Sequence, residues 1–164
     1  HPNSGGSIGH LGMLYAYSVC TRAQALRPLK STMKPIIPLP PILLIDDDPL
    51  VIETLRDLCE SMECHRQLHH LDTGSAFDAA ADPTLGLIIC DYRFPSSSGV
   101  SFIEQVRKRG IETPVLFISG TPDSDAVLKA ANLKRTAFLS KPFTISRFRE
   151  AIYGLLELSP SVAA

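Results

Sequence analysis

Polar side chains follow three short apolar runs of the sequence. Apolar runs of this length that contain β-branched residues are typical of strands buried on both faces of a parallel sheet. The runs, each with the polar residues that follow it, are Ile42–Ile45 with Asp46, Asp47 and Asp48, Leu85–Cys90 with Asp91, and Val115–Ile118 with Ser119. One Asp after a strand can simply begin a turn, but here the pattern repeats. Because open α/β folds bind ligands at the carboxyl edge of the sheet, the sequence predicts a site there.

The chemistry that these side chains offer is phosphoryl chemistry. Carboxylates close to one another repel unless a pKa rises or they share a cation, and an all-oxygen set of ligands suits Mg²⁺ best. Lys141 follows a further predicted strand and would offer its charge to a phosphate oxygen. The Ser119 hydroxyl would offer a hydrogen bond. A carboxylate can itself attack phosphorus and form an acyl phosphate.

The elements that must position these residues alternate between strand and helix five times. This alternation with short connections predicts an α/β fold, a doubly wound five-stranded parallel sheet with helices on both faces. Right-handed crossovers would place the carboxyl ends of all strands at one edge. The predicted strands are Ile42–Ile45, His65–His70 at an edge, Leu85–Cys90, Val115–Ile118 and Thr136–Leu139. The predicted helices cover 49 to about 63, 76–81, 100–109, a segment opening at Pro122-Asp123, and 145–158.

Composition predicts one domain without a charged surface for nucleic acid. The chain has 164 residues and a formal net charge of −1, and no run reaches the roughly 18 apolar residues of a membrane helix. The cysteines at 20, 59, 64 and 90 form no CxxC pair, which indicates reduced thiols in a cytoplasmic protein. The chain does not begin with Met, and 35–41 is rich in proline. We therefore expect three segments: an extension or linker over 1–38, which is an over-extended gene product, an expression remnant or the end of an upstream domain; a domain over 39–158; and a tail over 159–164.

Four motifs in order resemble the receiver domain of two-component response regulators from about Ile42 to Leu158. They are Leu44-Ile45-Asp46-Asp47-Asp48-Pro49, Ile88-Ile89-Cys90-Asp91-Tyr92-Arg93-Phe94-Pro95 with Gly99, Pro114-Val115-Leu116-Phe117-Ile118-Ser119-Gly120, and Phe138-Leu139-Ser140-Lys141-Pro142-Phe143. Each motif lies at the end of a predicted strand, which makes the set specific. The resemblance implies a flavodoxin-like fold with strand order 2-1-3-4-5.

The resemblance also implies a role for each residue of the site. Asp91 would be the phosphoacceptor, which takes a phosphoryl group from a phosphohistidine on a histidine kinase or a histidine phosphotransfer protein. Asp46, Asp47, Asp91 and the backbone carbonyl of Arg93 would hold Mg²⁺. Lys141 would bind the phosphoryl group, and the Lys141-Pro142 bond would be cis.

The resemblance implies a conformational switch made of Ser119 and Phe138. The Ser119 hydroxyl would move onto the phosphoryl group, and the aromatic ring at 138 would turn inward. Phe138 lacks the hydroxyl of the commoner Tyr, so an outward state would be less well hydrogen-bonded. Arg93 lies beside the acceptor, where side chains set the lifetime of the acyl phosphate.

The output of such a switch would be the face formed by the fourth helix, the fifth strand and the fifth helix, which the family uses for partners or for homodimers. The resemblance implies a signalling phosphoacceptor and not an enzyme. No output domain for nucleic acid or catalysis follows the last predicted helix, so we expect a stand-alone receiver or the terminal receiver of a hybrid histidine kinase.

Other interpretations of the same residues are weaker. A phosphorylation-independent interaction module on this fold would not need the complete set of site residues. A phosphatase with an Asp nucleophile would want a second acid two positions after Asp91, where this chain has Arg93. Asp48 fits a helix N-cap better than a metal ligand. A zinc site is a further alternative, from the Cys and His residues at 59, 64, 65, 69 and 70.

Overall fold

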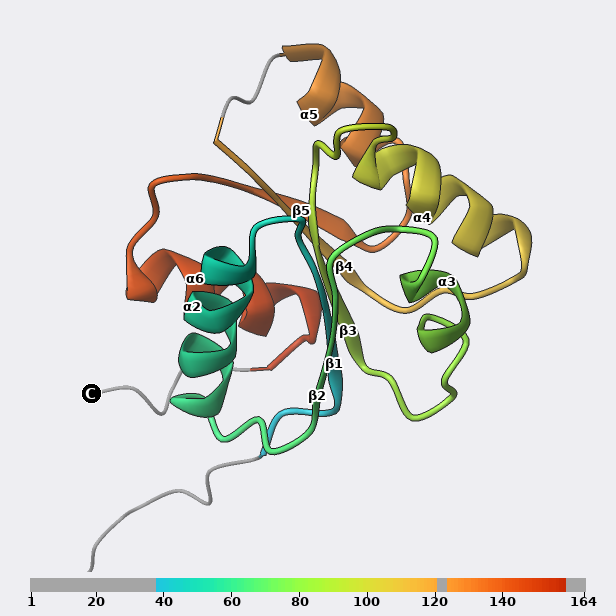
Figure 1. Ribbon diagram of the computed structural model, residues 1–164. Coiled ribbons are helices and arrows are strands. Elements are labelled where there is room, and N and C mark those ends of the chain that lie inside the picture. Colours follow the sequence, from blue (N-terminus) through green and yellow to red (C-terminus); the bar gives the residue numbers. More distant parts are fainter. Residues whose placement is uncertain (1–37, 121–123, 159–164) are drawn as a thin grey trace, which may run out of the picture. The chain divides into compact units, whose positions relative to one another are not determined.

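The computed structural model describes residues 38–120 and 124–158, and within them the chain forms a five-stranded sheet (Figure 1). All neighbouring strands are parallel, in the order β2-β1-β3-β4-β5. The strands are β1 (Ile42–Ile45), β2 (Gln67–His70), β3 (Leu87–Asp91), β4 (Val115–Ser119) and β5 (Thr136–Ser140). The predicted fold class and strand order are confirmed.

Helices cover both faces of the sheet (Figure 1). They are α2 (Pro49–Glu60), α3 (Ala76–Ala79), α4 (Gly99–Lys108), α5 (Ser124–Ala131) and α6 (Ile145–Leu155). Helices α2 and α6 bury side chains in one core, and α3, α4 and α5 bury theirs in the other. Among the described residues, no helix is both long and apolar enough to cross a membrane.

The middle of the sheet is buried on both faces, as its apolar runs predict. Every residue of β1 and β4 is buried, and β3 is buried up to Asp91. Alternate residues of a strand face opposite sides, so Leu44 and Ile89 join the core under α2 and α6, while Leu43 and Ile88 join the other. This burial fixes the register that brings the strand ends together.

Helix α2 begins as predicted and ends earlier. The side chain of Asp48 accepts a hydrogen bond from the backbone N–H of Leu50 at 2.9 Å, so Asp48 is the N-cap and Pro49 follows it. The helix ends at Glu60 rather than 63, because the backbone of Glu63 is left-handed with φ 61. Leu50 belongs to the apolar series of this helix but is 71% exposed.

Strand β1 has both of its predicted bounds, and several other boundaries differ by one to three residues. Strand β2 begins at Gln67 rather than His65, and α3 ends at Ala79 rather than 81. Helix α6 ends at Leu155 rather than 158, where Glu157 has a φ of 55. The predicted opening of a helix at Pro122-Asp123 lies outside the described residues. Gly110 ends α4 with a φ of 79, a conformation that glycine adopts without steric cost.

Candidate functional site

The ammonium group of Lys141 lies between two carboxylates at the carboxyl edge of the sheet. Its Nζ is 3.0 Å from Oδ2 of Asp46 and 3.1 Å from Oδ1 of Asp91. These partners are 95 and 50 positions away in the sequence. The fold therefore brings three of the predicted site residues into direct contact.

Strand register explains why they meet. Ile45 of β1 pairs with Cys90 of β3, so the aspartates that follow, Asp46 and Asp91, leave neighbouring strands at the same level. Strand β4 places Ser119 next along the sheet, and the backbone N–H of Lys141 donates to the Ser119 carbonyl at 2.7 Å. The end of β5 is thereby tied to the end of β4.

Asp46 is the buried carboxylate of the site, with a residue exposure of 2%. Its Oδ1 accepts a hydrogen bond from the backbone N–H of Asp48 at 2.9 Å, and its Oδ2 accepts one from Lys141. Burial raises the pKa of Asp46, and the charge of Asp91 adds to this effect, while the hydrogen bonds from Asp48 and Lys141 oppose it. The net direction is upward, so this carboxylate is costly to ionise in the folded chain.

Lys141 is held in its charged form. Burial alone would lower the pKa of the ammonium group, but its hydrogen bonds with Asp46 and Asp91, together with their negative charges, outweigh burial and raise the pKa. A lysine that stays protonated between two carboxylates is a fixed positive charge at the edge of the sheet. Such a charge can also bind an anionic oxygen.

Asp91 is more open than Asp46, with 12% side-chain exposure against 3%. Its Oδ2 accepts a hydrogen bond from the backbone N–H of Arg93 at 2.8 Å. The loop after Asp91 then folds back, and the backbone N–H of Gly99 donates to the carbonyl of Tyr92 at 2.9 Å. A Cβ at Gly99 would lie 2.2 Å from the Asp91 carbonyl oxygen, so this close approach requires glycine.

The remaining predicted residues surround this centre. Ser119 is buried at the end of β4, and Phe138 is half-buried on β5. Asp47 and Arg93 are exposed beside Asp46 and Asp91 respectively. The Lys141-Pro142 peptide bond is cis, as expected from the resemblance.

The donors at this edge fit a hard divalent cation in their chemistry. Asp46 and Asp91 present carboxylate oxygens side by side, and oxygen ligands are those that Mg²⁺ prefers. In the described residues, however, no group of three or more His, Cys, Asp or Glu side chains is already arranged around a common point. Asp46 and Asp91 are bound to Lys141 instead.

The zinc alternative is disfavoured by burial. Cys59 and Cys64 are free thiols inside the core, and burial raises the pKa of Cys59 to about 12. His65 and His69 are exposed. A buried thiol that resists ionisation is a poor metal ligand.

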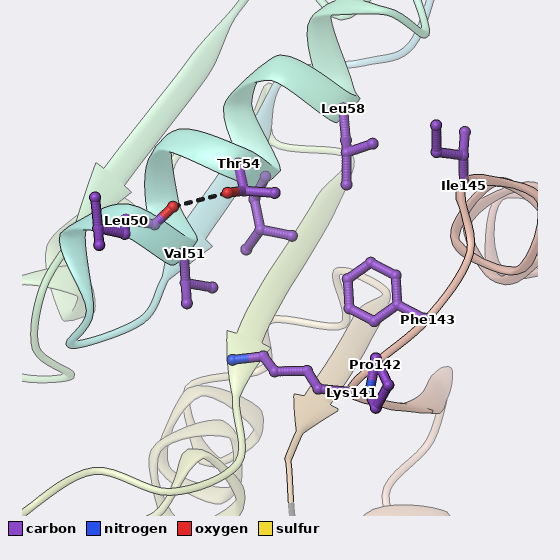
Figure 2. A pocket seen from close by; sticks show the side chains of 9 residues that line it. Leu50, Val51, Thr54, Leu58, Lys141, Pro142, Phe143 and Ile145 are labelled. Atoms are coloured by element: carbon purple, nitrogen blue, oxygen red, sulfur yellow. Dashed lines mark hydrogen bonds between the residues drawn. The ribbon is translucent and has the colours of Figure 1, made fainter.

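An apolar groove of about 430 Å³ lies next to the site (Figure 2). Leu50, Val51 and Leu58 of α2 form one side, and Phe143 and Ile145 form the other, with the stem of Lys141 at one end. This groove was not predicted from the sequence. In the sequence, the groove is indicated by the spacing of the apolar residues of α2. A helix packed wholly against a core would show the same spacing.

Tyr92 is a residue of the site region for which no role was predicted from the sequence. Its ring lies edge-to-face against Phe138, with ring centroids 5.9 Å apart, and against Phe117 at 6.5 Å. The sequence carries one signal for it, an aromatic residue directly after the predicted acceptor.

A doubly wound parallel sheet with a lysine bridging two aspartates at its carboxyl edge places this chain among α/β domains that carry a charged site at the ligand-binding edge of the sheet. The family model described as the response regulator receiver domain matches residues 42–153, and the chain belongs to this family. Members of the family are signalling phosphoacceptors that interact with histidine kinases or phosphotransfer proteins.

Curated relatives support the same family. The response regulator protein TodT of Pseudomonas putida is 32% identical over 124 residues, which are 73% of this chain and 52% of TodT. The transcriptional regulatory protein FixJ of Azorhizobium caulinodans is 32% identical over 103 residues, 63% of this chain and 48% of FixJ. The chain thus spans about half the length of these relatives.

Solved structures show the same fold. The chemotaxis protein CheY4 of Vibrio cholerae superimposes with a TM-score of 0.66 at 19% identity, covering 72% of this chain and 99% of CheY4. The beryllofluoride-activated NtrC4 receiver domain dimer superimposes with a TM-score of 0.65 at 24% identity, covering 71% of this chain and 96% of that one.

Proposed function

We propose that this chain takes a phosphoryl group from the phosphohistidine of a histidine kinase or histidine phosphotransfer protein onto Asp91, and changes conformation as a result. The observation that carries the proposal is the position of Lys141, whose ammonium group contacts the carboxylates of both Asp46 and Asp91. That charge stands beside the more open carboxylate, where the oxygens of an incoming phosphoryl group would lie.

In the proposed reaction an oxygen of the Asp91 carboxylate attacks phosphorus. The O–P bond of the acyl phosphate forms, the P–N bond to the donor imidazole breaks, and the imidazole leaves with the electron pair and takes up a proton. Lys141 pairs with one phosphoryl oxygen, and the Ser119 hydroxyl donates a hydrogen bond to another.

Asp46, Asp47, Asp91 and the backbone carbonyl of Arg93 are the groups that would hold Mg²⁺. The ion, when bound, supplies positive charge that offsets the charge of the transferring group. Because Asp46 is costly to ionise, a cation beside it would favour the ionised form of its carboxylate.

We further propose that the donor contacts the apolar groove beside Lys141. A donor must bring its phosphohistidine to Asp91 at this edge of the sheet, and the groove is the adjoining apolar surface. Leu50 is 71% exposed and Ile145 is 56% exposed there. Side chains of this kind lose apolar exposure when an amphipathic helix is bound.

In this proposal residues 39–158 form the receiver, and segments 1–38 and 159–164 lie outside it. A second copy of the chain is the proposed partner of the face formed by α5, β5 and α6. The site acts on its own phosphorylation state and not on an external substrate, because Arg93 stands where a phosphatase of this type would place its second acid.

The test is incubation of the full chain with Mg²⁺ and acetyl phosphate, followed by intact mass measurement. We expect the mass of one phosphoryl group to be added, and expect no addition with the Asp91→Asn variant. The matched control is Asp78→Asn, an exposed aspartate on α3, which should be labelled as well as the wild-type chain. An unlabelled wild-type chain would favour the phosphorylation-independent module, and catalytic turnover of acetyl phosphate without accumulated label would favour a phosphatase.

A further inference from the structure

Phe138 and Tyr92 form a ring contact that links the acceptor strand to the edge of the sheet. Their rings meet edge-to-face, with centroids 5.9 Å apart and an interplanar angle of 61°. Both side chains are half-buried and pack against the core under α3, α4 and α5. Phe138 has no hydroxyl, so its position depends on contacts of its ring.

The backbone of Tyr92 lies next to two residues of the site. Tyr92 follows Asp91, and its N–H donates to the carbonyl of Ile118 at 2.8 Å, one residue before Ser119. Its own carbonyl accepts from Gly99 at 2.9 Å. A backbone displacement at Asp91 or Ser119 would therefore act on the segment that carries the Tyr92 ring.

The Tyr92 ring contacts aromatic rings on both of the strands that follow the acceptor strand in the sheet. It contacts Phe117 of β4 at 6.5 Å, and Phe117 pairs with Phe138 of β5 in the sheet. An edge-to-face aromatic pair is worth about a twofold to tenfold change in an equilibrium constant. A contact of this size can bias which of two positions the Phe138 ring adopts.

We propose that Tyr92 transmits the state of Asp91 to Phe138, and that it is a positioning residue of this switch. The proposal rests on the proposed function of Asp91 and goes beyond it. The resemblance connects the aromatic residue at 138 with Ser119, whereas the contacts in this chain add a path that runs through the residue after the acceptor.

The experiment uses the full isotope-labelled chain with Mg²⁺ and beryllofluoride, a stable analogue of the phosphoryl group. Fluorine NMR reports binding at Asp91, and the amide and ring signals of Phe138 report the response at β5. In the wild-type chain we expect both. In Tyr92→Leu we expect binding to persist while the shift of the Phe138 signals falls by about twofold or more, in line with the worth of one ring pair.

Two further variants separate transmission from simple packing. Tyr92→Phe keeps the ring edge and should restore the Phe138 shift, whereas Tyr92→Met, an apolar side chain without a ring, should not. Phe77→Leu is the matched control, because it removes another edge-to-face pair, with Phe102 at 6.0 Å, in the same core; it should leave the Phe138 shift intact. If Tyr92→Leu folds poorly, Tyr92→Met carries the comparison.

The outcomes distinguish this inference from the function on which it rests. If the wild-type chain binds beryllofluoride but the Phe138 shift is the same in Tyr92→Leu or Tyr92→Met, the role of Tyr92 is wrong and the role of Asp91 stands. If Tyr92→Phe fails to restore the shift, the ring contact is not the path. If the wild-type chain does not bind beryllofluoride, the proposed function fails and this inference fails with it.

Discussion

The carboxylates of Asp46 and Asp91 both bind the ammonium group of Lys141, but their side chains differ in solvent exposure. Asp46 is enclosed at the end of β1, and Asp91 is the more open of the two. Burial disfavours the ionised form of a carboxylate, which explains why the pKa of Asp46 is raised in spite of its ion pair. The more open carboxylate is the one that a reactant can reach.

The raised pKa of Asp46 gives a prediction for stability against pH. Between the ordinary carboxyl pKa and the raised one, the unfolded chain has already released the proton that the folded chain still binds, so stability is lost as pH rises through this window. Asp46→Asn has no such proton. We expect it to be more stable than the wild-type chain at pH 7 without divalent ions, with the difference vanishing near pH 3, in thermal melts at both pH values. An equal difference at both values would contradict the assignment.

Removal of the Lys141 charge should have the opposite effect on stability. Lys141→Met keeps an apolar stem but leaves the carboxylates of Asp46 and Asp91 without their shared partner, and loss of hydrogen bonds to charged groups costs about 1–3 kcal/mol. Denaturant titration at pH 7 measures this loss. The control is Lys108→Met, at an exposed lysine at the end of α4, which should change the unfolding free energy little. Similar losses in both variants would show that the contacts of Lys141 with Asp46 and Asp91 do not stabilise the fold.

At the scale of the elements, the loop after β3 is set by the contact between Gly99 and the Asp91 backbone. An added Cβ would lie 2.2 Å from the Asp91 carbonyl oxygen and 2.9 Å from Sγ of Cys90. We expect Gly99→Ala to destabilise the fold by about 1–3 kcal/mol, the range for overpacking, and to slow phosphorylation because the acceptor strand must move.

Gly154 of α6 provides the comparison for Gly99. Nothing lies within 4 Å of a Cβ built there, and alanine is favoured over glycine in a helix by about 0.5–1 kcal/mol. Gly154→Ala should therefore raise the unfolding free energy and leave phosphorylation unchanged. Urea unfolding of both variants is the measurement, and destabilisation by Gly154→Ala with no effect of Gly99→Ala would contradict the packing described for the loop.

Some of the elements were predictable from the sequence, and others were not. Buried strands β1, β3 and β4 were predictable because their apolar runs are continuous, and the meeting of Asp46, Asp91 and Lys141 follows once parallel strands share an edge. The helix ends were harder to predict. Helices α2 and α6 end near Glu63 and Glu157, which adopt a left-handed backbone that a glutamate does not indicate in a sequence. The Tyr92–Phe138 contact depends on side-chain direction across three strands, which a pattern along one strand does not specify.

At the scale of the whole molecule, helix α5 carries exposed apolar side chains, and α5 is one of the elements of the α5, β5 and α6 face. Val127 is 40% exposed and Leu128 is 62% exposed on α5. Isolated apolar residues on a surface need no explanation, but adjacent ones beside the strand that carries Phe138 suit an interface that the switch controls. This is the face for which we propose a second copy of the chain.

Self-association of the full chain tests that proposal. We expect sedimentation velocity to show a larger dimer fraction with Mg²⁺ and beryllofluoride than without, because activation would change this face. Leu128→Glu should reduce the dimer fraction by placing a charge in an apolar contact. Leu71, 46% exposed in the loop after β2, offers the control Leu71→Glu. A dimer fraction that does not change with beryllofluoride, or that falls as much in Leu71→Glu as in Leu128→Glu, would place the interface elsewhere.

The central claim is that Asp91, and no other carboxylate at the sheet edge, accepts the phosphoryl group. The direct measurement is reduction of the phosphorylated chain with borohydride, which converts an aspartyl phosphate to homoserine, followed by peptide mass mapping. The account predicts homoserine at position 91 when Mg²⁺ and acetyl phosphate are present, with positions 46, 47 and 48 still aspartate. Homoserine at one of those positions, or at none, would contradict it.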